Sequence, residues 1–362
     1  MSFLSNLFGS SKSGKSVIGV DIGSSSLKVV QLRREGATAV LETYGELALG
    51  PYAGGEAGQA TNLPADTIAE SLRDLLREAN VTTRDAGISI PFSRSLLTLV
   101  ELPRRDDPDE QKTVIELEAR KYIPVPVSEV QLDYFIIPQA LPEGAEKPQK
   151  IQVLLVAVHN DELSLLENVV RGSELAATFY EIEIFSTIRS VVDEPVNPVL
   201  VLDIGASATK VYVVEHGVVA LSHNIPQGGQ DVTRTIATSQ GMSVGKAENL
   251  KKEHGFAQEA GTYDLRSIEL VFSRIFEEAK RALNQYESAH QKKVVSLILT
   301  GGGGVTRELE QYAKTFFAMD VHIANPFGKT QAPAFMQPVL ESIGPEFAVA
   351  VGLALRKLEE LG

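Results

Sequence analysis

The chain lacks or is short of several residue types on which whole classes of protein depend. Its 362 residues include no cysteine and only six histidines. Without cysteine the chain can form no disulfide framework and no thiolate metal site, and it has no cysteine nucleophile. No two histidines stand in an H-x-x-x-H or H-E-x-x-H arrangement, so we do not expect a zinc enzyme.

Positive charge and long apolar runs are also scarce. The net charge of −13 argues against nucleic acid as a partner, because nucleic-acid binding depends on Lys and Arg that neutralise phosphates. No uninterrupted apolar run approaches the roughly 18 residues of a membrane span. The stretch Met1 to Phe8 lacks the charged region and the long apolar region of a secretory signal. We therefore expect a cytoplasmic protein of about two or three domains.

What the chain does contain is one short pattern written twice. Residues 21–28 read D-I-G-S-S-S-L-K and residues 203–210 read D-I-G-A-S-A-T-K, so both fit D-I-G-x-S-x-x-K. Each copy lies within an apolar, β-branched run, which predicts a strand, a tight turn and a second strand. One copy alone would indicate an ordinary structural turn. Two copies half a chain apart predict two duplicated halves that face each other across a cleft.

The residue types in this pattern suit a phosphate group. Glycine lets the backbone approach a ligand, serine hydroxyls and successive backbone N–H groups donate to phosphate oxygens, and lysine adds a positive charge. The aspartate at the strand end supplies an oxygen for the outer shell of a Mg²⁺ ion. The doubled pattern therefore predicts a phosphate loop on each wall of the cleft.

A third glycine-rich stretch lies nearer the C-terminus. A buried strand expected over residues 294–300 runs into four glycines, residues 301–304, and a helix is expected over Val305 to Phe317. The absence of Cβ atoms leaves room for a flat ligand, and the helix N-terminus favours negative charge. A dinucleotide-binding turn is the alternative, but the roughly 60 residues that follow are too few for its usual βαβαβ half.

A match to the P-loop pattern near the start of the chain is not expected to bind phosphate. Gly9 to Ser16 fits G-x-x-x-x-G-K-[ST], but a P-loop follows a buried strand and opens a helix. Here the match follows the amphipathic stretch Met1 to Phe8 and opens a predicted strand, so we interpret it as a flexible linker. The amphipathic stretch itself has two interpretations, a frayed or packed terminal helix and an anchor to a membrane or partner.

Two modules are expected between and after the hairpins. Between them the pattern predicts strand, helix, strand, strand and helix over Leu97–Leu102, Asp109–Ile123, Val130–Ile137, Ile151–Val158 and Asp161–Leu175. Pro138 to Gln149 has the composition of an exposed hairpin loop. A helix-like pattern covers Tyr180 to Val192, and the second module, residues 232–288, is expected to be helical.

The order of these parts resembles the actin/Hsp70/sugar-kinase ATPase fold, a ribonuclease H-like α/β fold with two halves around a nucleotide cleft. In it the two hairpins resemble phosphate loops, residues 300–304 an adenosine loop, and Gly344 to Leu355 the second connecting helix. The inserted strand-helix-strand-strand module is similar to that of the branch that holds the cell-division FtsA and type IV pilus assembly PilM families.

Within that branch the PilM family is the more similar. The start of the chain, Y-E-I-E-I-F at residues 180–185 and A-E-N-L-K at residues 247–251 carry this resemblance. FtsA usually ends in a basic, aromatic amphipathic helix, a character that residues 357–362 do not have. The resemblance implies a division of the chain into an N-terminal segment and linker, 1–16; a first half, 17–96 with 176–197 and 345–362; an inserted SHS2-type module, 97–175; a second half, 198–230 with 290–344; and a helical module, 231–289.

The resemblance also implies ATP or ADP, bound with Mg²⁺ in the cleft. The residues that match the family's motifs would contact phosphates (Gly23, Ser24, Ser25, Lys28, Gly205, Ser207, Lys210), the adenosine (Glu248, Lys251, Gly302, Gly303, Gly304) and the hydrated metal (Asp21, Asp203). On its own, the pair Glu248 and Lys251 would be an ordinary i, i+3 surface pair.

Whether the chain hydrolyses ATP is open. Hydrolysis needs a residue that orients or deprotonates the attacking water, and Glu183 is the catalytic candidate by position. Its neighbour Glu181 could face the cleft instead, and either could be structural. We expect tight ATP binding with slow or negligible turnover, so that the nucleotide sets the angle between the halves.

The resemblance implies a scaffold of type IV pilus assembly on the cytoplasmic face of the inner membrane. Such a scaffold would dock the N-terminal tail of the membrane protein PilN in a groove beside the inserted module. Pilus motor ATPases, the platform protein, self-association and a weak or indirect membrane contact are further expectations. The alternatives are an FtsA-like protein that polymerises on the membrane and, ranked last, a small-molecule kinase, because no D-x-G-T-type acceptor motif occurs beyond the hairpins.

Overall fold

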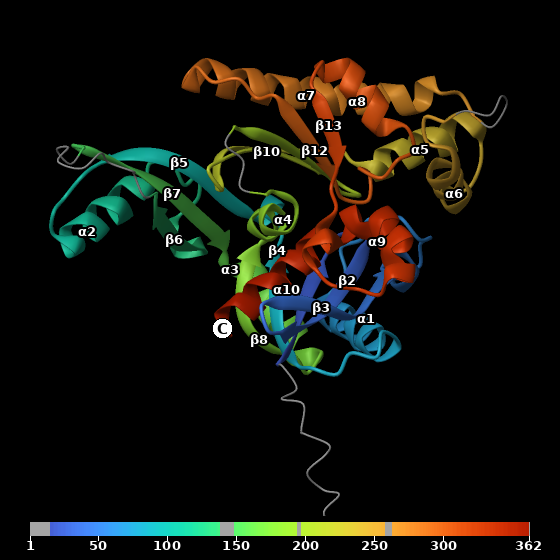
Figure 1. Ribbon diagram of the computed structural model, residues 1–362, viewed down its shortest axis with the longest axis horizontal. Helices are drawn as coiled ribbons and strands as arrows, with labels where there is room; N and C mark the ends of the chain where they lie inside the picture. Colours follow the sequence, from blue (N-terminus) through green and yellow to red (C-terminus); the bar gives the residue numbers. More distant parts are fainter. Residues whose placement is uncertain (1–14, 138–147, 194–196, 258–262, 362) are drawn as a thin grey trace, which may run out of the picture.

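The computed structural model describes residues 15–137, 148–193, 197–257 and 263–361 (Figure 1). These residues form three separate sheets with helices packed on them. The stretch Met1 to Phe8, its linker up to Gly14 and most of the predicted tip Pro138 to Gln149 lie outside the described residues.

The first sheet holds the first copy of the repeated pattern. Its strands lie in the order β3-β2-β1-β4-β8. β1 and β2 form an antiparallel hairpin in which Asp21 is paired with Lys28, and β4 and β8 continue the sheet in parallel. The interior of β1 is entirely buried, as in a strand covered on both faces. The strands are β1 (Ser16–Ile22), β2 (Ser26–Glu35), β3 (Thr38–Ala48), β4 (Asp85–Ile90) and β8 (Ala176–Ile182).

The second sheet repeats this plan. Its order is β11-β10-β9-β12-β13, with three antiparallel strands followed by two parallel ones. Lys210 is paired with Asp203, as Lys28 is with Asp21. The repeated pattern thus marks two sheets of one topology, built from β9 (Val199–Ile204), β10 (Thr209–Glu215), β11 (Val218–Ile225), β12 (Ser296–Thr300) and β13 (Asp320–Ile323).

The inserted module has a sheet and a core of its own. It runs β5 (Ser95–Pro103), α2 (Pro108–Ala119), β6 (Val130–Ile136), β7 (Lys150–His159) and α3 (Asn160–Gly172), with sheet order β5-β7-β6. Asp107 caps α2 by accepting from the backbone N–H groups of Asp109 and Glu110, and Pro108 fits the first helical turn. Figure 1 shows this sheet projecting to the left of the two halves.

Helices cover both main sheets. α10 (Ala348–Glu360) is the most deeply buried of those described and packs against β1, β2 and α4 (Glu183–Val191). The second sheet is covered by α5 (Gly229–Gln240), α7 (Arg266–His290) and α8 (Leu309–Phe317), whose apolar faces share one core. The remaining helices are α1 (Ala65–Glu78), α6 (Val244–His254) and α9 (Gln337–Ile343).

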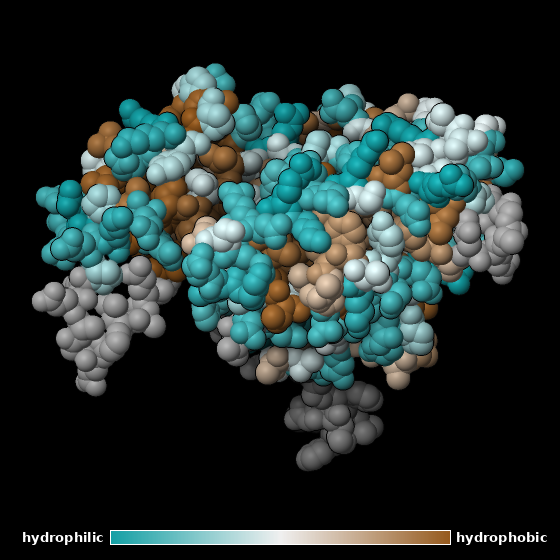
Figure 2. Space-filling view, turned by 90° about the horizontal axis from the view of Figure 1, so that it is seen from above, coloured by the Kyte–Doolittle hydropathy of each residue, from teal (hydrophilic) through white to brown (hydrophobic). Residues whose placement is uncertain are grey.

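One helical stretch, Ala334–Glu360, is long and apolar enough by length and composition to cross a membrane, and 61% of its most apolar window is buried inside the protein. Its buried part is α10, which forms the core of the first half. On the face shown in Figure 2, hydrophilic residues predominate and hydrophobic ones gather in separate areas.

The actin-like fold class is confirmed, whereas three predicted elements need correction. The expected helix Tyr180 to Val192 divides at Glu183, because residues 176–182 pair with β4 as a strand. Residues 305–308 form turns, so α8 begins only at Leu309. Gly344–Phe347 is a 3₁₀ turn before α10, which runs on to Glu360. The exact limits given for the five parts of the chain stay a prediction.

Candidate functional site

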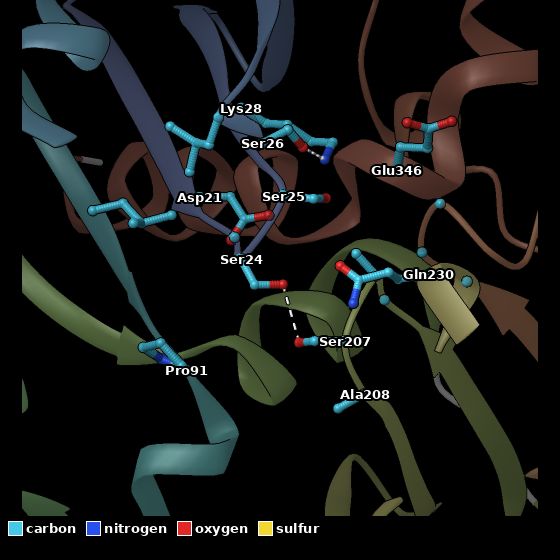
Figure 3. Close-up of a pocket in the computed structure, with 18 of the residues that line it drawn as sticks. Asp21, Ser24, Ser25, Ser26, Lys28, Pro91, Ser207, Ala208, Gln230 and Glu346 are labelled. Carbon is cyan, nitrogen blue, oxygen red and sulfur yellow. Dashed lines mark hydrogen bonds between the residues drawn. The ribbon is translucent and has the colours of Figure 1, made fainter. Parts of the chain in front are cut away.

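A cleft of about 660 Å³ lies between the two halves. It is lined by the hairpin turn of each half, by the glycines after β12 and by α6. Figure 3 shows Ser24 and Ser207 pointing toward each other across it. Their Oγ atoms are 3.0 Å apart, although 183 residues separate them in the chain. The facing arrangement predicted from the doubled pattern is therefore present.

The two turns have the same backbone geometry. Gly23 N donates to Ser26 O at 3.1 Å, and Gly205 N donates to Ala208 O at 3.0 Å. A Cβ atom at Gly23 would lie 2.9 Å from Ser26 O, and one at Gly205 would lie 3.0 Å from Ala208 O. Glycine at these two positions is therefore needed for the turn to close.

The first aspartate is held by a serine of the neighbouring strand. Ser89 Oγ donates to Asp21 Oδ1 at 3.1 Å and accepts from Ile22 N at 2.9 Å. Burial raises the pKa of Asp21, although the nearby Lys28 and Lys210 act in the opposite direction. Lys28 is itself bound by Ser26 Oγ at 2.6 Å and forms an ion pair with Glu46 at 3.1 Å.

The second hairpin places a lysine between two carboxylates. Lys210 Nζ lies 2.8 Å from Glu183 Oε2 and 3.2 Å from Asp203 Oδ2. Burial alone would lower the pKa of Lys210, but Asp203 and Glu183 outweigh burial, and the pKa is raised. Glu183 Oε1 also accepts from Phe92 N at 2.7 Å. Both oxygens of Glu183 are therefore occupied by donors of the protein.

The carboxylates suit a hydrated Mg²⁺ ion better than a directly coordinated one. Among the described residues no group of three or more His, Asp or Glu side chains is arranged to hold a metal ion directly. Asp21 and Asp203 nevertheless end the first strand of each half and line the same cleft. Oxygen ligands that contact the metal through water are typical of Mg²⁺, so these two residues fit the predicted role.

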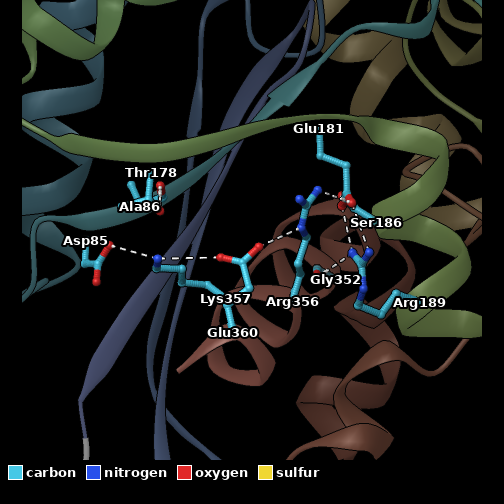
Figure 4. A network of polar contacts seen from close by, with 10 residues as sticks. All are labelled: Asp85, Ala86, Thr178, Glu181, Ser186, Arg189, Gly352, Arg356, Lys357 and Glu360. Atoms are coloured by element: carbon cyan, nitrogen blue, oxygen red, sulfur yellow. Dashed lines mark hydrogen bonds and ion pairs between the residues drawn. The ribbon is translucent and has the colours of Figure 1, made fainter. Parts of the chain in front are cut away.

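Glu181, the alternative to Glu183, faces away from the cleft. Its Oε2 accepts from Ser186 Oγ at 2.5 Å and from Arg189 at 2.7 Å, and its Oε1 accepts from Arg356 at 2.7 Å (Figure 4). Arg356 also lies over the ring of Phe179, 4.2 Å from its centroid. Glu181 is the penultimate residue of β8, whereas Glu183 is the first residue of α4, so the change from strand to helix between them gives the two side chains different surroundings. Glu183 is therefore the one that lines the cleft.

The pair predicted on the adenosine side is buried and fixed. Lys251 Nζ lies 2.6 Å from Glu248 Oε2 and 3.0 Å from Thr233 Oγ1, and it donates to Gly229 O at 3.2 Å. Burial lowers the pKa of Lys251. This pair joins α6 to α5 and is not the exposed surface pair that its spacing alone would indicate.

Three of the four glycines in the loop after β12, residues 301–304, line the cleft. Gly301, Gly302 and Gly303 lie along it, but Gly304 does not. Gly304 N donates to Gly301 O at 2.9 Å, and a Cβ there would lie 2.5 Å from Thr300 O. Gly304 therefore closes the turn, and Gly301 takes the place along the cleft that was predicted for it.

Three other cleft residues were not singled out from the sequence. Gln230 is the second residue of α5 and accepts from Ala60 N of the first half. The Oδ1 of Asn224, beside the second hairpin, is buried and has no hydrogen-bond partner in the part of the chain that the structure describes. Glu346 follows Pro345 at the far end of the cleft. Only Gln230 had a usable signal, because the turn P-Q-G-G-Q-D opens a helix, and a helix N-terminus attracts phosphate.

The family model described as type IV pilus assembly protein PilM matches residues 19–358. The chain belongs to the PilM family. Its place is thus in type IV pilus assembly, as the resemblance implied. The solved PilM–PilN type IV pilus biogenesis complex is similar over 94% of this chain and 98% of that chain, with a TM-score of 0.80 and 25% identity.

Two more distant proteins are similar to this PilM family member, one in structure and one in sequence. MreB 5 of Spiroplasma citri, solved bound to AMPPNP, covers 96% of the chain with a TM-score of 0.54 at 13% identity, which shows an actin-like fold. The cell division protein FtsA of Rhizobium meliloti is 25% identical over 224 residues, 55% of this chain. That match spans about half of the FtsA protein, 48% of its length.

Proposed function

We propose that this PilM family member binds ATP or ADP with Mg²⁺ between its two hairpins and uses the nucleotide to hold its halves at a fixed angle. The observation that carries the proposal is the pair of identical glycine turns whose serines meet at 3.0 Å. Backbone N–H groups and hydroxyls on two facing walls can hold a chain of phosphates from both sides. Such a ligand would add contacts to both halves and so tie them together.

Different residues along the cleft would contact different parts of the nucleotide. Ser24, Ser25 and Ser207 would donate to phosphate oxygens, and Lys28 and Lys210 would offset the phosphate charge. Asp21 and Asp203 would hold the hydrated Mg²⁺, which when bound neutralises phosphate charge. We place the adenosine between α6 and the loop Gly301–Gly303.

The state of Glu183 supports binding with slow hydrolysis. A general base needs a free lone pair within reach of the attacking water. Glu183 instead accepts from Phe92 N at 2.7 Å and from Lys210 at 2.8 Å. In this arrangement Glu183 positions Lys210, and each of its oxygens already accepts one hydrogen bond from a fixed donor. We therefore expect Glu183 to be a poor general base, although burial raises its pKa. Phosphate release faster than about 1 s⁻¹, the low end of ordinary enzyme rates, would contradict this part of the proposal.

The partner we propose is the N-terminal tail of PilN. The basis is family membership together with a relative solved as a PilM–PilN complex. One end of the cleft reaches the junction with the inserted module at Pro91, Arg94, Glu162 and Leu165, so a peptide bound beside that module would lie near the nucleotide. A location on the cytoplasmic face of the inner membrane, and contacts with motor ATPases, the platform protein or a second copy, belong to the same proposal.

The test is a substitution that places negative charge where phosphate would lie. Ser207 is exposed within the cleft, so Ser207→Asp should fold normally while it repels phosphate. We expect ATP affinity measured by calorimetry with Mg²⁺ to fall at least about 100-fold, since a like charge at hydrogen-bond distance costs several kcal/mol. The exposed α9 residue Ser342 provides the control Ser342→Asp.

Two outcomes would contradict the proposal. One is wild-type affinity for ATP in Ser207→Asp together with an unchanged melting curve. The other concerns the partner. Titration with a synthetic PilN N-terminal peptide should show saturable binding, and the absence of such binding would contradict the proposal. Co-sedimentation with ATP and lipid vesicles, without any peptide binding, would favour the FtsA-like alternative.

A further inference from the structure

One carboxylate at the proposed adenosine end of the cleft has no hydrogen-bond or ion-pair partner among the described residues. Glu346 lines the cleft, and its side chain makes no hydrogen bond or ion pair with any described residue. Glu346 is half-buried, and a partly buried charge without a hydrogen-bond partner is unfavourable. Burial and then the charge of Glu46 raise the pKa of Glu346, although the nearby Lys28, Lys252 and Lys251 act in the opposite direction.

The backbone beside Glu346 is fixed to the glycine loop. Pro345 O accepts from Gly301 N at 2.9 Å and from Thr300 Oγ1 at 3.0 Å. A Cβ atom added to Gly302 would lie 3.8 Å from Glu346 Oε2. The carboxylate therefore stands directly beside the glycine against which a nucleoside would lie.

The other carboxylates at this end are already taken. Glu46 is paired with Lys28 at 3.1 Å. Glu248 is paired with Lys251 at 2.6 Å and accepts from Thr233 Oγ1 at 2.5 Å. Among the three, Glu346 alone has both oxygens free of contacts within the described part of the chain.

A free carboxylate selects hydrogen-bond donors and repels phosphate. The phosphates belong at the serine turns, and Figure 3 shows Glu346 at the upper right, set apart from Ser24 and Ser207. The donors left on an adenine nucleotide are the amino group of the base and the hydroxyls of the ribose. Acidic side chains recognise ribose hydroxyls in this way in other nucleotide folds.

We infer that Glu346 is a specificity-determining residue that accepts a hydrogen bond from the nucleoside, either from the adenine amino group or from the 2′-hydroxyl of the ribose. The inference rests on the proposed nucleotide binding and assigns to Glu346 the recognition of the nucleoside. Glu248, which the family resemblance places beside the adenosine, then acts mainly through Lys251 to fix α6.

The test compares the binding of three nucleotides to wild-type protein and to two variants. ATP, inosine triphosphate, which lacks the amino group, and 2′-deoxy-ATP are titrated calorimetrically into wild-type protein, Glu346→Ala and Glu346→Gln. Glu346→Ala should weaken ATP binding about tenfold, the usual effect of losing a hydrogen bond to a charged group, and Glu346→Gln should weaken it less. The exposed residue Glu341, on the preceding helix, provides the control Glu341→Ala.

The preference that disappears identifies the donor. Loss of the preference for ATP over inosine triphosphate in Glu346→Ala assigns the base, and loss of the preference over 2′-deoxy-ATP assigns the ribose. If both preferences keep their wild-type size in Glu346→Ala, the inference is overturned, whether or not ATP binds more weakly. If wild-type protein binds no ATP, the proposed function itself fails, and the two failures are thereby distinguished.

Discussion

Two glutamates separated by one residue have opposite surroundings. Glu183 lines the cleft and is bound by Lys210 and a backbone N–H, whereas Glu181 lies behind the sheet among two arginines and a serine. Between them β8 ends and α4 begins, and this change of backbone direction separates the two side chains. Glu181 therefore contributes to stability and Glu183 to the site.

Glu181 makes the stability of the protein depend on pH. Burial by itself would raise the pKa of Glu181, but Arg189, Ser186 and Arg356 outweigh burial and lower it below the usual 4.5. Because the folded pKa is the lower one, this stabilisation is fully present above about pH 4.5 and is lost as the pH falls through the folded pKa.

We therefore expect Glu181→Gln to be less stable than wild type by about 2 kcal/mol at pH 7, the usual worth of hydrogen bonds to a charged group when the partners are partly exposed. The difference should shrink as the pH is lowered below 4.5. Urea denaturation at several pH values measures both effects. The exposed Glu359 gives the control Glu359→Gln, and a difference that stays constant with pH would contradict the assignment.

At the scale of the element, the position of α10 depends on its close approach to α4 and to β1. A Cβ atom at Gly352 would lie 1.9 Å from Ser186 O of α4, and one at Gly19 of β1 would lie 1.9 Å from Ala350 O of α10. Two glycines thus let α10 contact α4 on one side and β1 on the other. α10 can pack this closely in the core only because neither glycine has a side chain.

Gly352→Ala should accordingly destabilise the protein although alanine is the better helix former. The gain in helix propensity is about 1 kcal/mol, whereas forcing an extra carbon into a packed core costs about 3 kcal/mol. We expect a net loss of about 2 kcal/mol, seen as an earlier urea midpoint. The control Glu359→Ala, at an exposed position of the same helix, should leave the urea midpoint nearly unchanged. A midpoint for Gly352→Ala equal to that of the wild type would disprove the close contact.

The sequence predicted the elements with strong local signals and missed those set by distant partners. The hairpins at Asp21 and Asp203 and the inserted strands were predicted because their apolar runs and turns are local features. The strand before Glu183 was assigned to a helix, since only pairing with β4 makes it a strand. Glu346 and Asn224 have no local signal at all, because the cleft that they line forms only when both halves meet.

At the scale of the whole molecule, the loop before α1 closes over the adenosine end of the cleft. Glu56 Oε2 accepts from Gly245 N of α6 at 2.5 Å, and Ala60 N donates to Gln230 of α5. A Cβ at Gly58 would lie 2.8 Å from the side chain of Glu248. This loop belongs to the first half and contacts the second half beside the proposed nucleoside site.

Breaking this contact should speed nucleotide release without unfolding the protein. For Glu56→Ala we expect a fluorescent ATP analogue to dissociate about three- to tenfold faster in stopped-flow experiments, the effect of losing one partly exposed hydrogen bond to a charged group. The melting temperature should change little, because Glu56 is exposed. Glu70→Ala, on the exposed face of α1, is the matched control, and an unchanged dissociation rate in Glu56→Ala would show that the loop does not retain the nucleotide.

The position of α10 also affects the order in which the protein is made. One core cluster of the first half joins residues near 17–41 to residues 327–358, so this face of β1 and β2 stays uncovered until those later residues have been synthesised. The inserted module and the second half are complete earlier, and domains generally fold as they emerge during synthesis. We expect the half that is begun first to be finished last, with β1 and β2 exposed in the meantime to chaperones that bind apolar strands.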